Sequence, residues 1–242
     1  MKNSFLTLLL ICFLSSMSFA QYGISVGYKH LGASNWENLV ANYNLGANTN
    51  FSPIQEGTNF AFDYSFRLKK KRIEFHPEIS YSRFIRDWKF EDESYSVDMK
   101  SNFFNLSFHT NIYPLDFAGD CNCPTFSKDG SFFEKGFFIQ ISPTASLINN
   151  TFKDTERKID SSDLAFGIGI GTGIDFGLSD FITISPIFRY SYLFGAEWDD
   201  LDQHLKIDSA DFSDKNTTNI STIYLGLRLG FRFDELNKYG YR

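Results

Sequence analysis

The chain has 242 residues and carries 29 acidic against 23 basic side chains, so its formal net charge is −6 at pH 7. This acidic balance argues against nucleic acid as a partner, because such proteins need a basic surface. Aromatic residues make up 18% of the chain, and aromatic girdles at two membrane interfaces are a specific cause of such a content. After residue 20, no stretch approaches the length of apolar sequence that a transmembrane helix needs.

The first twenty residues have the pattern of a secretory signal peptide. Lys2 gives a positive start, an apolar run covers 5–14, and small residues Ser18 and Ala20 occupy the positions that a signal peptidase recognises. We predict cleavage before Gln21. The remaining residues are enough for one large β domain.

Eight later segments alternate large apolar with small or polar side chains. The clearest is 59–68, where five large apolar residues stand at every second position, a spacing that no helix would present. The expected strands cover 21–31, 59–68, 73–81, 104–112, 139–147, 164–176, 182–192 and 223–233. We predict an all-β fold, an eight-stranded antiparallel up-and-down transmembrane β-barrel. Pro77, Pro143 and Pro186 fall within strands and predict bulges or local gaps.

The lengths of the connections orient this barrel. Outer-membrane barrels alternate short periplasmic turns with long external loops. The connections 69–72 and 177–180 are short, whereas 32–58, 88–101, 149–163 and 195–220 are long and rich in Asn, Asp, Ser and Glu. Both chain ends are therefore expected in the periplasm. The segment 114–136 is the exception, because it is long on the side where turns should be short. The expected barrel covers 21–233, followed by a tail at 234–242.

If the apolar faces meet lipid, the polar faces line the interior of the barrel, the lumen. An eight-stranded barrel is only just wide enough for side chains to fill it, and charges in that space must pair. We predict a plug of mutually neutralising side chains; the alternative is a narrow, slightly positive passage. The glycine run 167–173 either leaves room for a ligand or, as we favour, accommodates large neighbours such as Tyr224. The expected lumen charge network is Lys29, Asp63, Arg67, His76, Glu78, Asp175, Arg189, Arg228 and Arg232.

Two further features lie in connections. Export favours a disulfide between Cys121 and Cys123, although so tight a ring would be strained; free thiols or a metal site are the alternatives, and a metal would need further ligands. The last external loop is acidic, which predicts a solvated loop or, alternatively, divalent-cation binding. Its acidic residues are Glu197, Asp199, Asp200, Asp202, Asp208, Asp211 and Asp214. No metal or cofactor is predicted.

An outer-membrane lipid hydrolase would need a serine activated by a histidine. The motif known from lipid A deacylases has serine two positions after histidine, and none of the four histidines is followed in this way. A protease-like acidic cluster has only a loose candidate in 199–204. We therefore predict a non-enzymatic protein that acts through acidic external loops. A narrow porin-like channel, a lipid hydrolase and a soluble lipocalin-like barrel are the alternatives.

The segment 119–126, with Cys121 and Cys123 before Pro124, resembles the small outer-membrane barrels of Bacteroidota described as porin-like or PorT-like. The stretch 177–181 and the Phe-rich strands share this resemblance. It implies the cell outer membrane as location. The expected partners are outer-membrane lipid, the barrel-assembly machinery and an envelope or secretion-system protein. One departure concerns assembly: Phe233 is followed by a tail, so the terminal aromatic signal is internal or is supplied by Tyr241.

Overall fold

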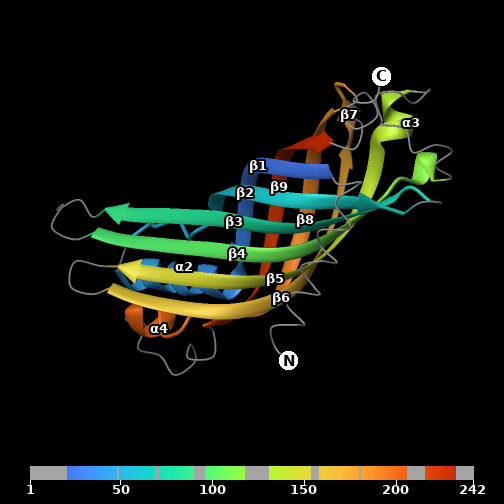
Figure 1. Cartoon of the computed structure of the whole chain (residues 1–242). Helices are drawn as coiled ribbons and strands as arrows, with labels where there is room; N and C mark the ends of the chain where they lie inside the picture. Colours follow the sequence, from blue (N-terminus) through green and yellow to red (C-terminus); the bar gives the residue numbers. More distant parts are fainter. Residues whose placement is uncertain are drawn as a thin grey trace, which may run out of the picture.

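The computed structural model describes residues 21–47, 49–68, 71–89, 96–117, 131–153, 158–179, 181–205 and 216–232. The predicted signal peptide, the cysteine pair and the C-terminal tail lie outside these ranges. In the described part, eight long antiparallel strands form a barrel (Figure 1). The strands are β1 (Gln21–Ala33), β2 (Glu56–Arg67), β3 (Ile73–Lys89), β4 (Ser96–Ile112), β5 (Phe137–Lys153), β6 (Lys158–Ile174), β8 (Ile182–Glu197) and β9 (Thr217–Arg232).

The barrel is closed around its whole circumference. Each long strand pairs with its neighbours in sequence, β1 pairs with β9 from Gln21 opposite Arg232 to Ala33 opposite Ile220, and β6 pairs with β8. The two-residue strand β7 (Phe176–Gly177) continues β6 along β8. The predicted fold class is confirmed, and the first and last described residues lie at the same rim, with the short connections. Following the predicted orientation, we call this rim periplasmic and the opposite end extracellular.

The outer surface of the barrel is apolar, as the alternation predicted. Ile79 and Leu106, for example, expose 68% and 62% of their surface. A soluble protein rarely exposes so continuous an apolar surface, and a closed barrel satisfies its backbone hydrogen bonds internally, as a bilayer requires. The chain is an outer-membrane-type β-barrel, and its location is the outer membrane. None of the helices in the described part is long and apolar enough to cross a membrane.

A band of aromatic rings lies on β1 to β4 in the periplasmic half of this surface. Neighbouring rings across β1 to β4 have centroids between 5.3 and 6.2 Å apart. Aromatic rings at the lipid–water boundary are typical of transmembrane barrels, and this band corresponds to part of one of the two predicted girdles. The rings belong to Tyr22, Phe62, Tyr64, Phe66, Phe75 and Phe108.

The strands β3 to β6 are longer than predicted. Only residues 90–95 separate β3 from β4, and only 154–157 separate β5 from β6, so the loops expected at 88–101 and 149–163 are mostly strand. The reason is the inward face, which stays apolar beyond the membrane: Phe84, Phe103 and Ile148 are buried there. These side chains pack against each other and extend the sheet pairing above the lipid.

The connection predicted as a loop at 32–58 contains a helix, α2 (Ser34–Ala47). Trp36, Leu39 and Val40 recur at helical spacing, and all three are buried. The helix lies at the extracellular end of the barrel with the short helix α4 (Leu201–His204), whereas η2 (Pro114–Asp116) and α3 (Phe132–Gly136) lie at the opposite rim (Figure 1). The predicted loop was wrong because the strand alternation gives no signal for an amphipathic helix between two strands.

All three prolines in strands interrupt the sheet as predicted. At Pro186, the pairing with β8 skips from Gly173–Ile187 on β6 to Phe176–Ile184 on β7. The pairing between β4 and β5 skips from Ser107–Thr144 to Thr110–Ile141, at Pro143. The pairing between β2 and β3 skips from Asp63–Glu78 to Phe66–Phe75, at Pro77. Proline has no N–H for the ladder, so each gap opens beside it.

Candidate functional site

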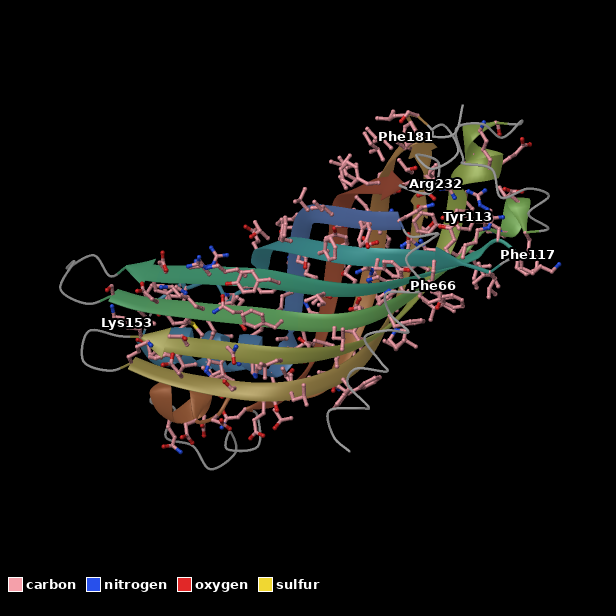
Figure 2. All side chains as sticks on the ribbon, in the orientation of Figure 1. Phe66, Tyr113, Phe117, Lys153, Phe181 and Arg232 are labelled. Atoms are coloured by element: carbon pink, nitrogen blue, oxygen red, sulfur yellow. The ribbon has the colours of Figure 1, made fainter. Side chains whose placement is uncertain are left out.

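The interior of the barrel has three layers of side chains. An apolar layer, the mouth core, fills the extracellular end; a polar layer, the lumen network, follows in the middle; a smaller cluster, the rim cluster, lies at the periplasmic end. Figure 2 shows Lys153 at the extracellular end, and Tyr113 and Arg232 at the periplasmic end. The strands supply these layers with the side chains that point inward at every second position, and the helices at either end of the barrel complete the outer two layers.

The mouth core is built from the upper strands together with α2 and α4. Trp36 of α2 packs edge-on against Trp198, with 5.3 Å between the ring centroids, and its indole N–H donates to the carbonyl of Asn216 (2.7 Å). On the other side, Phe51 stacks on Trp88 at 4.7 Å with an 8° angle between the rings. Leu39, Leu201 and Leu205 are buried beside them. This layer therefore fills the extracellular end of the described barrel with apolar side chains.

The lumen network centres on a buried ion pair between Asp63 and Arg228. Both residues were predicted to face the lumen, but not to contact each other. Arg228 donates to both carboxylate oxygens of Asp63, from Nε at 2.8 Å and from Nη2 at 2.6 Å. His76 Nδ1 lies 3.4 Å from the same carboxylate, and its Nε2 lies 3.2 Å from the amide nitrogen of Asn111.

The network continues across the lumen through uncharged side chains. The Gln140 amide donates to Asn111 (2.7 Å) and its oxygen accepts from Arg189 Nε (2.7 Å). Arg189 also lies 3.6 Å from Glu78, whose carboxylate is 3.2 Å from His109 Nε2. Two arginines and two carboxylates thus neutralise each other, as a low-dielectric interior requires.

Glycines provide the space for these long side chains. A Cβ at Gly23 would overlap the Asp63 carboxylate and the Arg228 guanidinium, so this glycine makes room for the ion pair. We predicted that the glycine run 167–173 makes room for Tyr224, and the structure shows that other glycines do so. Tyr224 lies against Gly27 and Gly226, whereas the run faces Leu193, Arg189 and Phe138.

Of the other predicted network members, three lie at the margins. The Lys29 amine donates to Ser82 (2.9 Å), Arg67 lies opposite Glu74 in the β2–β3 pairing, and Arg232 lies beside Gln21 at the rim. The structure therefore joins Asp63, His76, Glu78, Arg189 and Arg228 into one network, and distributes the remaining predicted residues around it.

Asp175 belongs instead to the rim cluster. It accepts hydrogen bonds from Tyr113 (2.6 Å) and from Ser185 (2.5 Å). Arg72 lies over the Tyr113 ring at 4.0 Å, pairs with Asp116 at 2.5 Å and donates to the carbonyl of Lys135. Burial, with the facing charge of Asp175, raises the pKa of Tyr113 well above its usual value, so its hydroxyl stays a donor.

The rim cluster explains part of the long periplasmic connection. Arg72 ties the turn after β2 to the 3-10 helix η2 through Asp116 and to α3 through Lys135. Arg72 was expected in the turn 69–72, and no role was predicted for Tyr113. Their only sequence signal is a cation and a large aromatic residue directly beside predicted strands.

One contact in the lumen has the composition of a hydrolase triad. His109 Nδ1 lies 2.8 Å from Ser142 Oγ, and His109 Nε2 lies 3.2 Å from Glu78. The search by sequence spacing missed it because the serine and histidine come from different strands. Ser142 has 0% of its surface exposed, so a substrate carbonyl reaches Oγ only by displacing the network. A hydrolase needs room beside its nucleophile, and these three side chains are buried members of the lumen network.

The acidic external loop is described only in part. Asp199 accepts from Ser161 (2.9 Å), and Asp202 exchanges hydrogen bonds with Asn216 (2.9 and 3.1 Å). The candidate protease-like cluster is thus held by separate partners. Among the described residues, no group of three or more His, Cys, Asp or Glu side chains could hold a metal ion.

No protein-family profile matches the chain, and no curated protein matches it by sequence. Among solved structures, it is similar to Neisserial surface protein A, with 12% identity over 89% of this chain and 97% of that one, at a TM-score of 0.47. A major outer membrane protein of Thermus thermophilus shares 10% identity over 88% and 99% at a TM-score of 0.47. The attachment invasion locus protein of Yersinia pestis shares 12% over 88% and 99% at 0.43. Similarities of this size concern the general architecture alone.

Proposed function

We propose that this protein is a non-enzymatic, non-conducting outer-membrane barrel that acts through its extracellular cap. We define the cap as α2, α4 and the strand ends 158–163 and 195–205. The observation that carries the proposal is the mouth core, in which Leu39 and Trp36 of α2 are buried inside the barrel end. A solute channel would need an open path, and a helix packed into the mouth favours a scaffold for its own outer surface instead.

The cap holds acidic side chains in fixed positions. The backbone N–H of Glu197 donates to Asp163 (2.9 Å), and Ser161 donates to Asp199 (2.9 Å). Glu197 and Asp200 are exposed beside them. Fixed negative charges attract a basic surface and suppress acidic ones. We therefore propose a basic partner protein of the cell envelope.

We also propose that the chain is related to the small outer-membrane barrels of Bacteroidota. The resemblance of 119–126 to small barrels of Bacteroidota supports a partner in the envelope or in a secretion system, and that segment lies outside the described residues. Insertion through the barrel-assembly machinery is proposed on the barrel fold.

The test compares cell-surface cross-linking by three forms of the full-length protein. The cap variant is Glu197→Gln with Asp200→Asn, and the control is Glu134→Gln, an exposed carboxylate on α3 at the opposite rim. We expect an envelope protein that cross-links to the wild type and the control, and much less to the cap variant. Equal cross-linking to all three forms would contradict the proposal.

A further inference from the structure

The outer face of β3 to β6 changes sharply from apolar to polar. Paired residues form rows across the four strands, and Tyr81, Phe104, Leu147 and Leu164 form the last fully apolar row. The next row toward the cell exterior is Arg83, Asn102, Asn149 and Ser162. Side chains of this boundary row face the headgroups of the outer leaflet, because the apolar rows below face hydrocarbon.

Two cations stand at this boundary, and neither has a partner among the described residues. Arg83 belongs to the boundary row and Lys100 to the row above it, on the adjacent strand. Both side chains face outward, and no described residue makes a hydrogen bond or ion pair with either. The acidic residues nearest along these strands, Asp87 and Asp98, form the row beyond Lys100. The two positive charges therefore lie on the lipid side of these two carboxylates, whose row also contains Lys153 and Lys158 on β5 and β6.

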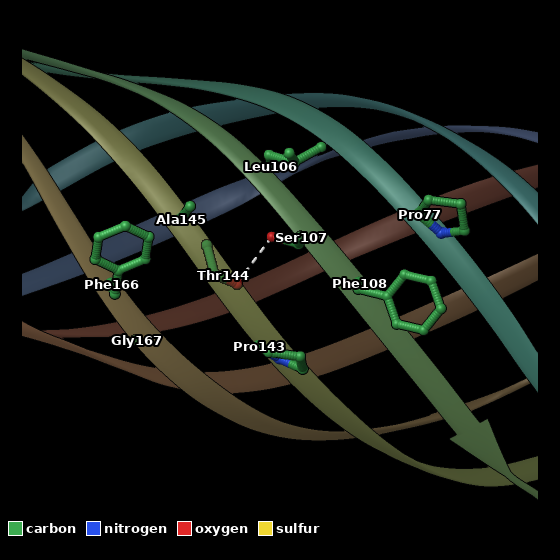
Figure 3. Close-up of a pocket in the computed structure, with 9 residues that line it drawn as sticks. All are labelled: Pro77, Leu106, Ser107, Phe108, Pro143, Thr144, Ala145, Phe166 and Gly167. Atoms are coloured by element: carbon green, nitrogen blue, oxygen red, sulfur yellow. Dashed lines mark hydrogen bonds between the residues drawn. The ribbon is translucent and has the colours of Figure 1, made fainter. Parts of the chain in front are cut away.

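Below the cations, the wall of the barrel contains a groove that opens toward the lipid (Figure 3). It has a volume of about 430 Å³ and is lined by Pro77, Leu106, Ser107, Phe108, Pro143, Thr144, Ala145, Phe166 and Gly167. The gap in the β4–β5 pairing at Pro143 opens it, and the small side chain of Ala145 leaves it unfilled. At its base, the hydroxyls of Ser107 and Thr144 bond to each other at 2.9 Å.

The groove and the cations are spaced as the parts of one lipid would be. Ala145 pairs with Leu106, four residues along β4 from the boundary residue Asn102, which corresponds to about 14 Å along a strand. With the usual tilt, the groove lies roughly 10 Å below the boundary, within the ~15 Å thickness of one leaflet. An acyl chain that descends from a headgroup at Arg83 and Lys100 reaches the groove.

We infer that this face binds one phosphate-bearing lipid of the outer leaflet. Arg83 and Lys100 would contact the phosphate, since Arg donates in a planar fork and Lys acts as a point charge. One acyl chain would lie between Leu106 and Phe166, over Ala145. The inference concerns the lipid-facing wall and is independent of the role proposed for the cap.

The experiment measures lipid binding to the purified full-length barrel in detergent. The probes are lipid A with its two phosphates and the dephosphorylated form with the same acyl chains, and native mass spectrometry counts the bound molecules. We expect one tightly held lipid A and roughly thirtyfold weaker binding of the dephosphorylated form, at ~1 kcal/mol for each cation. This comparison needs no variant, and equal binding of the two lipids would overturn the inference.

Variants locate the site. Arg83→Gln with Lys100→Gln should weaken lipid A binding as much as dephosphorylation does. The control is Lys153→Gln with Lys158→Gln, two outward cations in the row of Asp87 and Asp98, and it should leave lipid A binding unchanged. Ala145→Phe should weaken binding about fivefold or more by filling the groove, and Leu225→Phe on β9 is its control. Equal effects of a variant and its control would refute the site. Displacement of lipid A by excess inorganic phosphate would show an ion site only.

Discussion

Removing Arg228 should expose how much the barrel depends on charge pairing in its lumen. Asp63 is 2% exposed and accepts two hydrogen bonds from Arg228, at 2.8 and 2.6 Å. In Arg228→Met, the carboxylate keeps only the longer contact with His76. Breaking a buried ion pair on one side costs about 3–5 kcal/mol, because the remaining charge stays buried without compensation. We expect a loss of unfolding free energy of that size.

The assay is equilibrium urea unfolding of the barrel in lipid vesicles, followed by Trp fluorescence. The matched control is the double variant Asp63→Leu with Arg228→Met, which removes both charges. Replacing a buried pair by apolar side chains is often close to neutral, so the double variant should regain most of the lost stability. A loss below about 1 kcal/mol in the single variant, or a double variant as unstable as the single one, would refute the pairing argument.

The other substitutions address the glycine, the cap and the rim. Gly23→Ala should cost about 1–3 kcal/mol of unfolding free energy, because its Cβ would overlap the ion pair. The control is Ser25→Ala on the same strand, which removes a hydroxyl that has no partner among the described residues. An equal loss of unfolding free energy in the two variants would contradict this reasoning. Leu39→Ala should lower the unfolding free energy by about 2–5 kcal/mol, because it opens a cavity in the mouth core. Leu45→Ala, at a side chain that is 82% exposed, should change the unfolding free energy little. Equal losses in the two variants would show that α2 is not packed into the barrel. Tyr113→Phe should cost about 1–3 kcal/mol by leaving Asp175 without its 2.6 Å donor, and an unchanged urea midpoint would contradict the rim cluster.

The barrel could be predicted because one physical requirement repeats in every strand. Lipid outside and packed side chains inside force an alternation of period two, and eight segments show it. The helix α2 could not be found in the same way. Its apolar positions, such as Trp36 and Leu39, recur at helical spacing over one short segment between strands, where a loop was the expected connection.

In the lumen, the inward orientation of the side chains could be predicted from the sequence, but their pairwise contacts could not. That Asp63 and Arg228 face inward follows from alternation, but they are 165 residues apart in the chain. Which inward residues meet depends on the stagger of the strands around the barrel, and residue spacing does not contain that information. The contact between His109 and Ser142, and the rim contacts of Arg72 and Tyr113, were missed for the same reason.

The lengths of the strands were underestimated for a different reason. The prediction followed outward apolar residues, and these end at the lipid boundary near Tyr81 and Phe104. The strands continue because inward residues such as Trp88 and Met99 pack in the mouth core above the membrane. A search for apolar inward residues beyond that boundary would have predicted the longer strands.

The central claim is that the interior is filled from the mouth core to the rim. Single-channel recording of the refolded full-length protein in planar lipid bilayers tests it most directly. We expect no conductance steps from the wild type, and steps to appear when Trp36→Ala and Leu39→Ala together weaken the packing of α2 in the mouth. Reproducible open steps from the wild-type barrel would contradict the claim and would favour the narrow channel instead.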